Sequence, residues 1–171
     1  MTLANTLVGH IDPFWDIDTI KSFPYTRQPI SDEETDMWIS QGYDHIKNFS
    51  GLMYSSKNIM PDWVTMFEDE FTDFKNITYN FYKMDTLDIM PTHSDHYRTY
   101  VKLFDAVPSN IYRILVMLED WKPGHYLEVD NVGVVNWKAG DYFMWNNDTP
   151  HAASNIGIDS RYTLQITAEI I

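Results

Sequence analysis

From about residue 77 onward, the sequence is a succession of short apolar or alternating runs separated by turn residues. These runs are rich in Ile, Val, Tyr, Phe and Trp, which favour strands, while Pro and Gly fall between them. Many short strands after helices favour a jelly roll or barrel with the helices packed outside. A β-sandwich that only binds a ligand fits the same pattern. The predicted strands span residues 77–84, 92–101, 112–119, 126–129, 132–137, 141–145, 151–155 and 161–170.

Two helices are predicted ahead of these strands. Ser31 and Glu34 have the spacing of a capping box, so a helix begins at Ser31 and extends to about Phe49. A second helix begins at Pro61, whose missing N–H costs nothing in a first turn. Residues 1–30 contain three prolines among aromatic residues and predict irregular structure or short strands. The apolar residues after Pro61 recur at spacings typical of one helix face packed on a core: Trp63, Met66, Phe67, Phe71 and Phe74.

Length and charge limit the classes of protein to which this chain can belong. Its 171 residues suffice for one domain with a full core, which we divide into N-terminal residues 1–76 and a β core at 77–171. A net charge of −13 repels phosphate backbones and anionic lipid, so we expect neither nucleic acid nor a membrane as partner. The absence of Cys excludes thiolate nucleophiles and Cys-ligated zinc. The first residues lack the features of a signal peptide, so we expect a cytoplasmic protein.

His93 and Asp95 are the first candidate metal ligands. They are two residues apart in the predicted strand 92–101, and residues at that spacing point to the same face of a strand. A neutral imidazole and a carboxylate are suitable ligands for a divalent transition metal. The alternative is a surface His that happens to lie beside an Asp.

His151 is the third candidate ligand and follows the turn-forming residues 147–150. Two imidazoles and one carboxylate form the ligand set of non-haem iron(II) oxygenases, which leaves coordination positions open. The alternative is that His151 only caps a turn.

Arg161 follows His151 by ten positions and opens the last predicted strand, 161–170. A polar face on a central strand is costly unless it lines a wet or liganded cavity. Because Arg forms bidentate hydrogen bonds with carboxylates, an anion site is predicted there. A structural salt bridge is the alternative, since the chain has 25 acidic residues. The polar face of the strand comprises Arg161, Thr163, Gln165 and Thr167.

The motifs His93-x-Asp95, His151 and Arg161-x-Thr163 together resemble the signature of the 2-oxoglutarate and iron(II)-dependent oxygenases. Their order, the ten-residue interval and the hydroxyl residue two positions after Arg161 all match. The likeness is closest to the prolyl-hydroxylase-like and aspartyl/asparaginyl-hydroxylase-like branches, and it covers roughly residues 77–170. Residues 1–76 match none of the motifs of these branches.

The chain departs from the prolyl hydroxylases at two places. Residues 125–128 read His-Tyr-Leu-Glu, where those enzymes usually have Gly-Gly-Glu-Thr. Arg161 stands where they usually hold the cosubstrate with Lys. The resemblance therefore implies a fold and a cofactor, but it does not identify the substrate.

The resemblance implies a double-stranded β-helix, that is a cupin-like jelly roll, with N-terminal helices packed outside. It implies Fe(II) on His93, Asp95 and His151, with O2 as co-reactant. Arg161 and Thr163 would hold 2-oxoglutarate, and Tyr82 would contact its distal carboxylate, although Tyr82 could equally be a core residue. The implied reaction oxidises a C–H bond and yields succinate and CO2, most simply as a hydroxylase of a peptidyl side chain, an amino acid or a small metabolite.

Two other functions fit the same residues. A cupin-like metalloenzyme of another reaction class, such as an isomerase, would use the same ligands without needing Arg161. A non-catalytic jelly-roll binding module would need neither the metal ligands nor Arg161, and its His and Asp residues would be incidental. Three further residues keep two interpretations: His96 is a surface or ligand-supporting residue, His125 a substrate contact or an ordinary loop residue, and Arg113 a second anion contact or a rim charge. The oligomeric state is not indicated.

Overall fold

The computed structural model describes residues 7–44, 46, 49–55 and 57–171, and β-strands dominate this part of the chain. The strands are β1 (Leu7–His10), β2 (Thr26–Arg27), β3 (Leu52–Ser55), β4 (Phe74–Met84), β5 (Ile89–His93), β6 (Ile111–Met117), β7 (His125–Val129), β8 (Val132–Val134), β9 (Asp141–Asn146), β10 (His151–Asn155) and β11 (Arg161–Ile170). The helices are α1 (Ile17–Lys21), α2 (Asp32–Ser40) and α3 (Arg98–Phe104), with 3-10 helices η1 (Asp62–Asp69) and η2 (Pro108–Asn110).

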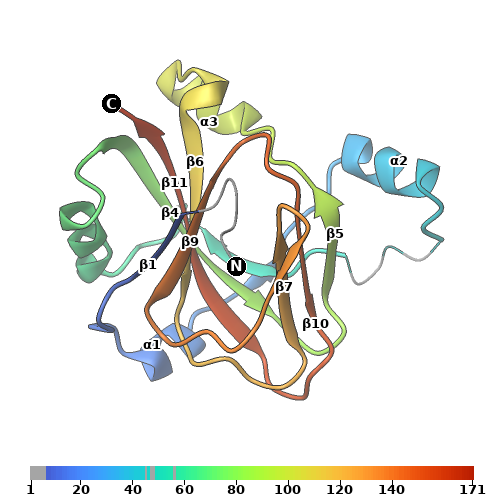
Figure 1. Ribbon diagram of the computed structural model, residues 1–171, viewed down its shortest axis with the longest axis horizontal. Coiled ribbons are helices and arrows are strands. Elements are labelled where there is room, and N and C mark those ends of the chain that lie inside the picture. Colours follow the sequence, from blue (N-terminus) through green and yellow to red (C-terminus); the bar gives the residue numbers. More distant parts are fainter. Residues whose placement is uncertain (1–6, 45, 47–48, 56) are drawn as a thin grey trace.

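The described strands form two antiparallel sheets that face each other (Figure 1). The larger sheet has the order β1-β9-β6-β11-β4-β3-β2, and the smaller has the order β5-β10-β7-β8. From β4 to β11 the chain crosses repeatedly between the sheets, so β4 pairs with β11 although most of the β core separates them. This alternation is the double-stranded β-helix, and the predicted mainly β, cupin-like jelly roll is confirmed.

The two faces of β11 have different surroundings, as its alternating sequence predicts. Tyr162, Leu164 and Ile166 belong to an apolar cluster on the outer face of the larger sheet. Ile20 of α1 and Phe67 of η1 join that cluster, so α1 and η1 cover this face, whereas no residue of α2 belongs to it. Arg161 and Gln165 point the other way, into a cavity between the sheets.

The helix predicted from Ser31 is present but short. The capping box is confirmed, because Ser31 accepts from the Glu34 backbone while the Glu34 side chain accepts from the Ser31 N–H. The helix ends at Ser40 instead of near Phe49. Gly42, with φ of +97°, adopts the left-handed conformation that commonly ends a helix. Residues 45, 47 and 48 of the predicted helix lie outside the described residues.

The second predicted helix is a 3-10 helix over Asp62–Asp69, preceded by Pro61. In a 3-10 helix residues three apart share a face, and Val64 and Phe67 are the buried residues. The predicted stripe is therefore wrong for Met66, which is half exposed, and Phe74 belongs instead to β4.

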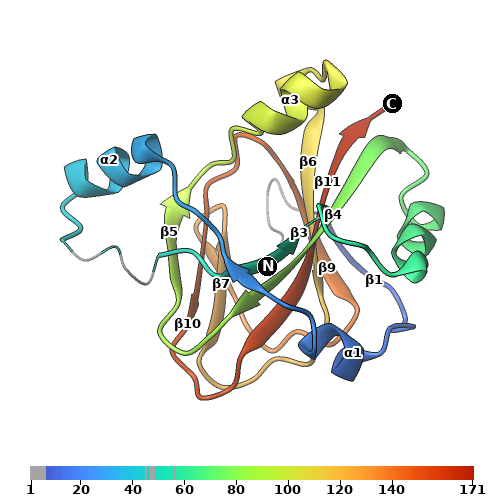
Figure 2. The ribbon, with the colours of Figure 1, turned by 180° about the vertical axis from the view of Figure 1, so that it is seen from behind.

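The N-terminal region also supplies strands at both edges of the larger sheet. The first strand, β1, pairs with β9 at one edge, whereas β3 pairs with β4 and carries β2 at the other (Figure 2). Residues 1–76 are thus more than an irregular segment with two helices. The division at residue 76 stays a prediction.

The predicted strand 92–101 is wrong. Strand β5 ends at His93, and after a short connection α3 begins at Arg98. Tyr100, Val101 and Phe104 pack into a small cluster with Ile111. That helical spacing was present in the sequence, but the β-branched and aromatic residues favoured a strand. No helix among the described residues has the length and apolarity to cross a bilayer.

Candidate metal centre and adjoining cavity

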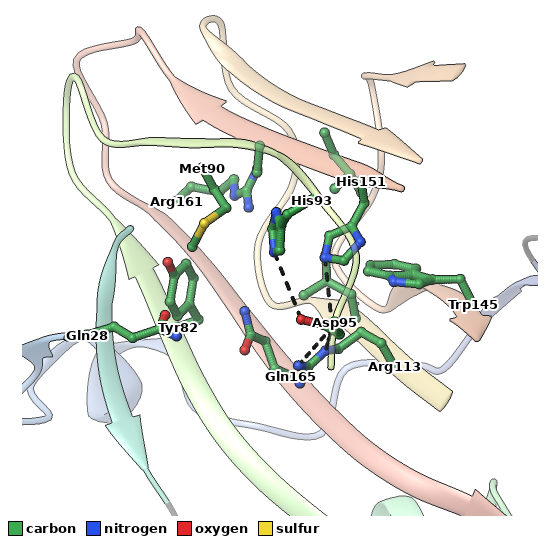
Figure 3. Close-up of a pocket in the computed structure, with 13 residues that line it drawn as sticks. Gln28, Tyr82, Met90, His93, Asp95, Arg113, Trp145, His151, Arg161 and Gln165 are labelled. Atoms are coloured by element: carbon green, nitrogen blue, oxygen red, sulfur yellow. Dashed lines mark hydrogen bonds and ion pairs between the residues drawn. The ribbon is translucent and has the colours of Figure 1, made fainter. Parts of the chain in front are cut away.

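A cavity lies between the two sheets and contains every residue proposed as a metal ligand (Figure 3). Its empty space is about 520 Å³, including the solvent at its open mouth. The smaller sheet contributes His93 and His151, and the connection between β5 and α3 contributes Asp95. The larger sheet contributes Tyr82, Arg113, Arg161 and Gln165, while Gln28 comes from the segment after β2.

The two imidazoles lie next to each other because strand pairing places them there. His93 is the last residue of β5, His151 is the first of β10, and the two are register partners. Nδ1–H of His93 donates to the Pro91 carbonyl at 2.8 Å, and Nδ1–H of His151 donates to the Thr149 carbonyl at 3.0 Å. A carbonyl oxygen can only accept, so Nδ1 carries the proton and Nε2 keeps a lone pair for a metal.

Asp95 faces both imidazoles, although it does not lie in a strand. Its Oδ1 is 3.9 Å from Nε2 of His93, and its Oδ2 is 3.8 Å from Nε2 of His151. One donor atom from each of the three residues lies within 4.8 Å of the others. Nitrogen and oxygen ligands lie roughly 2 Å from a transition metal, so atoms this close together can share one ion.

The electrostatics keep these donors in the protonation states that metal binding requires. Burial lowers the pKa of His151 to about 4, so its imidazole is neutral at pH 7. Burial by itself raises the pKa of Asp95, but the adjoining charge of Arg113 outweighs it and holds that pKa well below the usual range. The centre therefore offers a carboxylate and a neutral imidazole without first having to lose protons.

Arg113 is the partner of Asp95, which the sequence did not indicate. Its Nε and Nη2 donate to Oδ2 of Asp95 at 3.2 and 3.1 Å, and its Nη1 donates to the Thr167 hydroxyl at 2.9 Å. Tyr97 adds a hydroxyl donor to the same Oδ2 at 2.8 Å. Arg113 is thus neither a rim charge nor a free anion site. Its register position opposite Thr167, on the polar face of β11, is the signal that could have located it.

Arg161 lies at the other end of the cavity from Asp95 (Figure 3). The residue is 4% exposed, and its Nη1 donates to the Tyr126 carbonyl at 2.7 Å. Its Nε is buried without a partner, and no carboxylate among the described residues pairs with it. Burial lowers the pKa of Arg161 to about 10, so it remains a cation at pH 7. The alternative of a structural salt bridge is therefore wrong within the described part of the chain.

Tyr82 and Thr163 adjoin Arg161 on the larger sheet, where they are register partners on β4 and β11. The Tyr82 oxygen accepts from the Gly51 N–H, so its own proton can be donated elsewhere. Burial raises the pKa of Tyr82 to about 12, which keeps that proton in place. The Thr163 hydroxyl is buried without a partner in the described residues. Arg161 and Tyr82 line the cavity and can donate to an anion there, whereas Thr163 is not among the residues that line it.

The remaining histidines of the β core lie outside the cavity lining. His125 is buried, and its Nε2–H donates to the Asp159 carbonyl at 2.9 Å, so its role is structural. His96 is exposed, as expected. The sequence did not indicate Trp145, whose ring centroid lies 5.0 Å from that of His151 and whose side chain forms part of the cavity wall.

Comparison with known proteins supports the fold without showing a family. No protein-family model matches the sequence, and a search of curated proteins found no match. A prolyl-4-hydroxylase from Pseudomonas putida superposes with a TM-score of 0.54 at 12% identity, over 91% of this chain and 97% of that one.

The carbocyclase SnoK of nogalamycin biosynthesis, a non-haem α-ketoglutarate-dependent enzyme, superposes with a TM-score of 0.55 at 10% identity, over 90% of this chain and 82% of its own. At these identities the likeness shows the fold alone. The chain therefore has the jelly roll shared by cupins and 2-oxoglutarate oxygenases.

Proposed function

We propose that this protein is an Fe(II) and 2-oxoglutarate-dependent oxygenase, most simply a hydroxylase of a peptidyl side chain, an amino acid or a small metabolite. One observation carries the proposal. A single cavity has two metal-competent imidazoles and a carboxylate at one end, and at the other a buried guanidinium with no acidic partner among the described residues.

The metal end suits Fe(II) in its donor chemistry. In this proposal His93, Asp95 and His151 hold the ion from one side, which leaves its other side open to the cavity. The bound iron supplies the oxidation of a C–H bond by O2, coupled to conversion of 2-oxoglutarate into succinate and CO2. The chain's part is to fix the ligand geometry and to exclude water between its two sheets.

The opposite end suits the distal carboxylate of 2-oxoglutarate. Arg161 would provide two charge-assisted hydrogen bonds, and the Tyr82 hydroxyl, which also lines the cavity, can add a third donor. An unpaired buried cation is costly, and an anionic ligand relieves that cost. A cupin-like enzyme that takes no such anion offers no reason for Arg161 to be buried and unpaired, so the oxygenase is the preferred function.

The test is release of succinate from 2-oxoglutarate by the purified protein with Fe(II), ascorbate and a panel of candidate substrates. Slow turnover without substrate is expected, and it should disappear in His93→Ala. His96→Ala is the matched control, because His96 is exposed and lies three residues away. If the wild-type protein binds Fe(II) but never consumes 2-oxoglutarate, a cupin-like metalloenzyme of another class replaces the proposal. If it binds no metal, a binding module replaces it.

A further inference from the structure

Of the three proposed ligands, Asp95 alone lies outside a strand. His93 and His151 are fixed by the pairing of β5 with β10, and each imidazole is oriented by a hydrogen bond to a carbonyl. Asp95 instead lies in the connection between β5 and α3, where no sheet register sets its direction. Its side chain has several rotamers open to it, so contacts from elsewhere in the fold must select one.

Arg113 and Tyr97 supply those contacts. Two nitrogens of the Arg113 guanidinium and the Tyr97 hydroxyl all donate to Oδ2 of Asp95. The third guanidinium nitrogen donates to Thr167 on β11, so the fork is anchored to the larger sheet. Arg113 also lies over the Tyr97 ring, with 5.3 Å between the guanidinium carbon and the ring centroid. These donors occupy Oδ2, and Oδ1 keeps no hydrogen-bond donor among the described residues.

We propose that Arg113 is a positioning residue for the metal centre and that, with Tyr97, it orients Asp95 so that Oδ1 alone is presented to the metal. This inference rests on the proposed function, because it assumes that a metal binds the three ligands. A carboxylate held by one oxygen occupies one coordination position rather than two. The larger sheet thereby orients a ligand that follows β5, a strand of the smaller sheet.

The sign of the effect separates positioning from simple electrostatics. A guanidinium beside the ligand repels a divalent cation, so its removal would strengthen metal binding if charge alone mattered. If Arg113 positions Asp95, its removal frees the carboxylate and weakens metal binding. Groups that orient metal ligands typically contribute about 10–100-fold to metal affinity, which is large enough for the two cases to be distinguished.

The experiment is anaerobic titration of the metal-free protein with Co(II), which reports affinity and coordination through its visible absorption. Arg113→Lys keeps the buried charge but loses the fork, and Arg113→Met loses both. Both variants should bind Co(II) about tenfold or more weakly, with altered visible bands, and Tyr97→Phe should weaken binding less. Arg98→Met is the control, because Arg98 is exposed, pairs with Glu33 and adjoins Tyr97 in sequence.

Circular dichroism and thermal unfolding show whether each variant is folded. If Arg113→Met does not fold, Arg113→Lys decides the question, because it leaves no buried carboxylate without a cation. Co(II) affinity in folded Arg113→Lys that equals or exceeds the wild-type value would overturn the proposal. Absence of Co(II) binding by the wild-type protein would instead overturn the proposed function, and this proposal with it.

Discussion

Replacing Arg161 with Ala tests what distinguishes an oxygenase from other cupin-like metal proteins. Arg161 is 4% exposed and lines the cavity, and its pKa of about 10 keeps it charged at pH 7. The distal carboxylate of 2-oxoglutarate would form a charge-assisted, desolvated pair with it. Truncating one partner of such a pair costs roughly 2–5 kcal/mol, which corresponds to about a thirtyfold or larger loss of cosubstrate affinity.

The assay is anaerobic titration of the Fe(II) protein with 2-oxoglutarate, followed by the metal-to-ligand charge-transfer absorption. Iron affinity should be unchanged in Arg161→Ala, because Arg161 is not one of the proposed ligands. Arg161→Lys keeps the charge but cannot form the bidentate pair of hydrogen bonds, so its affinity for 2-oxoglutarate should lie between those of Arg161→Ala and the wild type. If Arg161→Ala binds 2-oxoglutarate as tightly as the wild type, the reasoning is refuted. Arg161 is then a structural residue whose role is its hydrogen bond to the Tyr126 carbonyl.

Three further predictions use other parts of the molecule. His93→Ala and His151→Ala should each abolish tight metal binding while circular dichroism stays unchanged; full metal content in both would place the site elsewhere. Burial lowers the pKa of His125 below its ordinary 6.5, so as the pH drops below 6.5 the imidazole is protonated more readily in the unfolded chain than in the folded protein. The free energy of unfolding should therefore decrease as the pH drops below 6.5. Urea unfolding of the wild type and His125→Asn at several pH values checks this, and an equal pH dependence in both would contradict it. At a net charge of −13, no salt-sensitive binding to DNA or RNA is expected, and micromolar affinity for an oligonucleotide at moderate salt would disprove that.

The strands that the sequence located best are those whose pattern depends only on local alternation. The predicted bounds of β10 and β11 agree with the structure. Turn residues precede each of these strands, and the sequence of β11 also alternates regularly with a period of two. Short strands were among the expectations for residues 1–30, where β1 and β2 lie, but their bounds and strand β3 were not predicted. These strands are short, and each is defined by pairing with another segment of the chain and not by its own sequence pattern.

The candidate site was found for a reason that is only half correct. Strand alternation was expected to aim His93 and Asp95 together, yet the strand ends at His93 and tertiary contacts aim Asp95. The motif spacing was sufficient to identify the residues but not to explain their geometry. Arg113 and Tyr97 were assigned no role at the metal end because their contacts with Asp95 follow from register with β11 and from the start of α3. Neither the register of β6 with β11 nor the start of α3 can be predicted from the sequence of one segment alone.

An unsatisfied polar atom in a protein core lowers the free energy of unfolding, so each one calls for an explanation. In the described part of the chain, three such atoms lie on the cavity wall or beside it: Nε of Arg161, the Thr163 hydroxyl and Nε1 of Trp145. The first two belong to one face of β11, whereas the opposite face of that strand is packed with apolar side chains. A core under selection for stability alone would carry apolar residues on both faces. This is why we propose a polar ligand that completes the hydrogen bonds of this face, and the buried positive charge of Arg161 favours an anion.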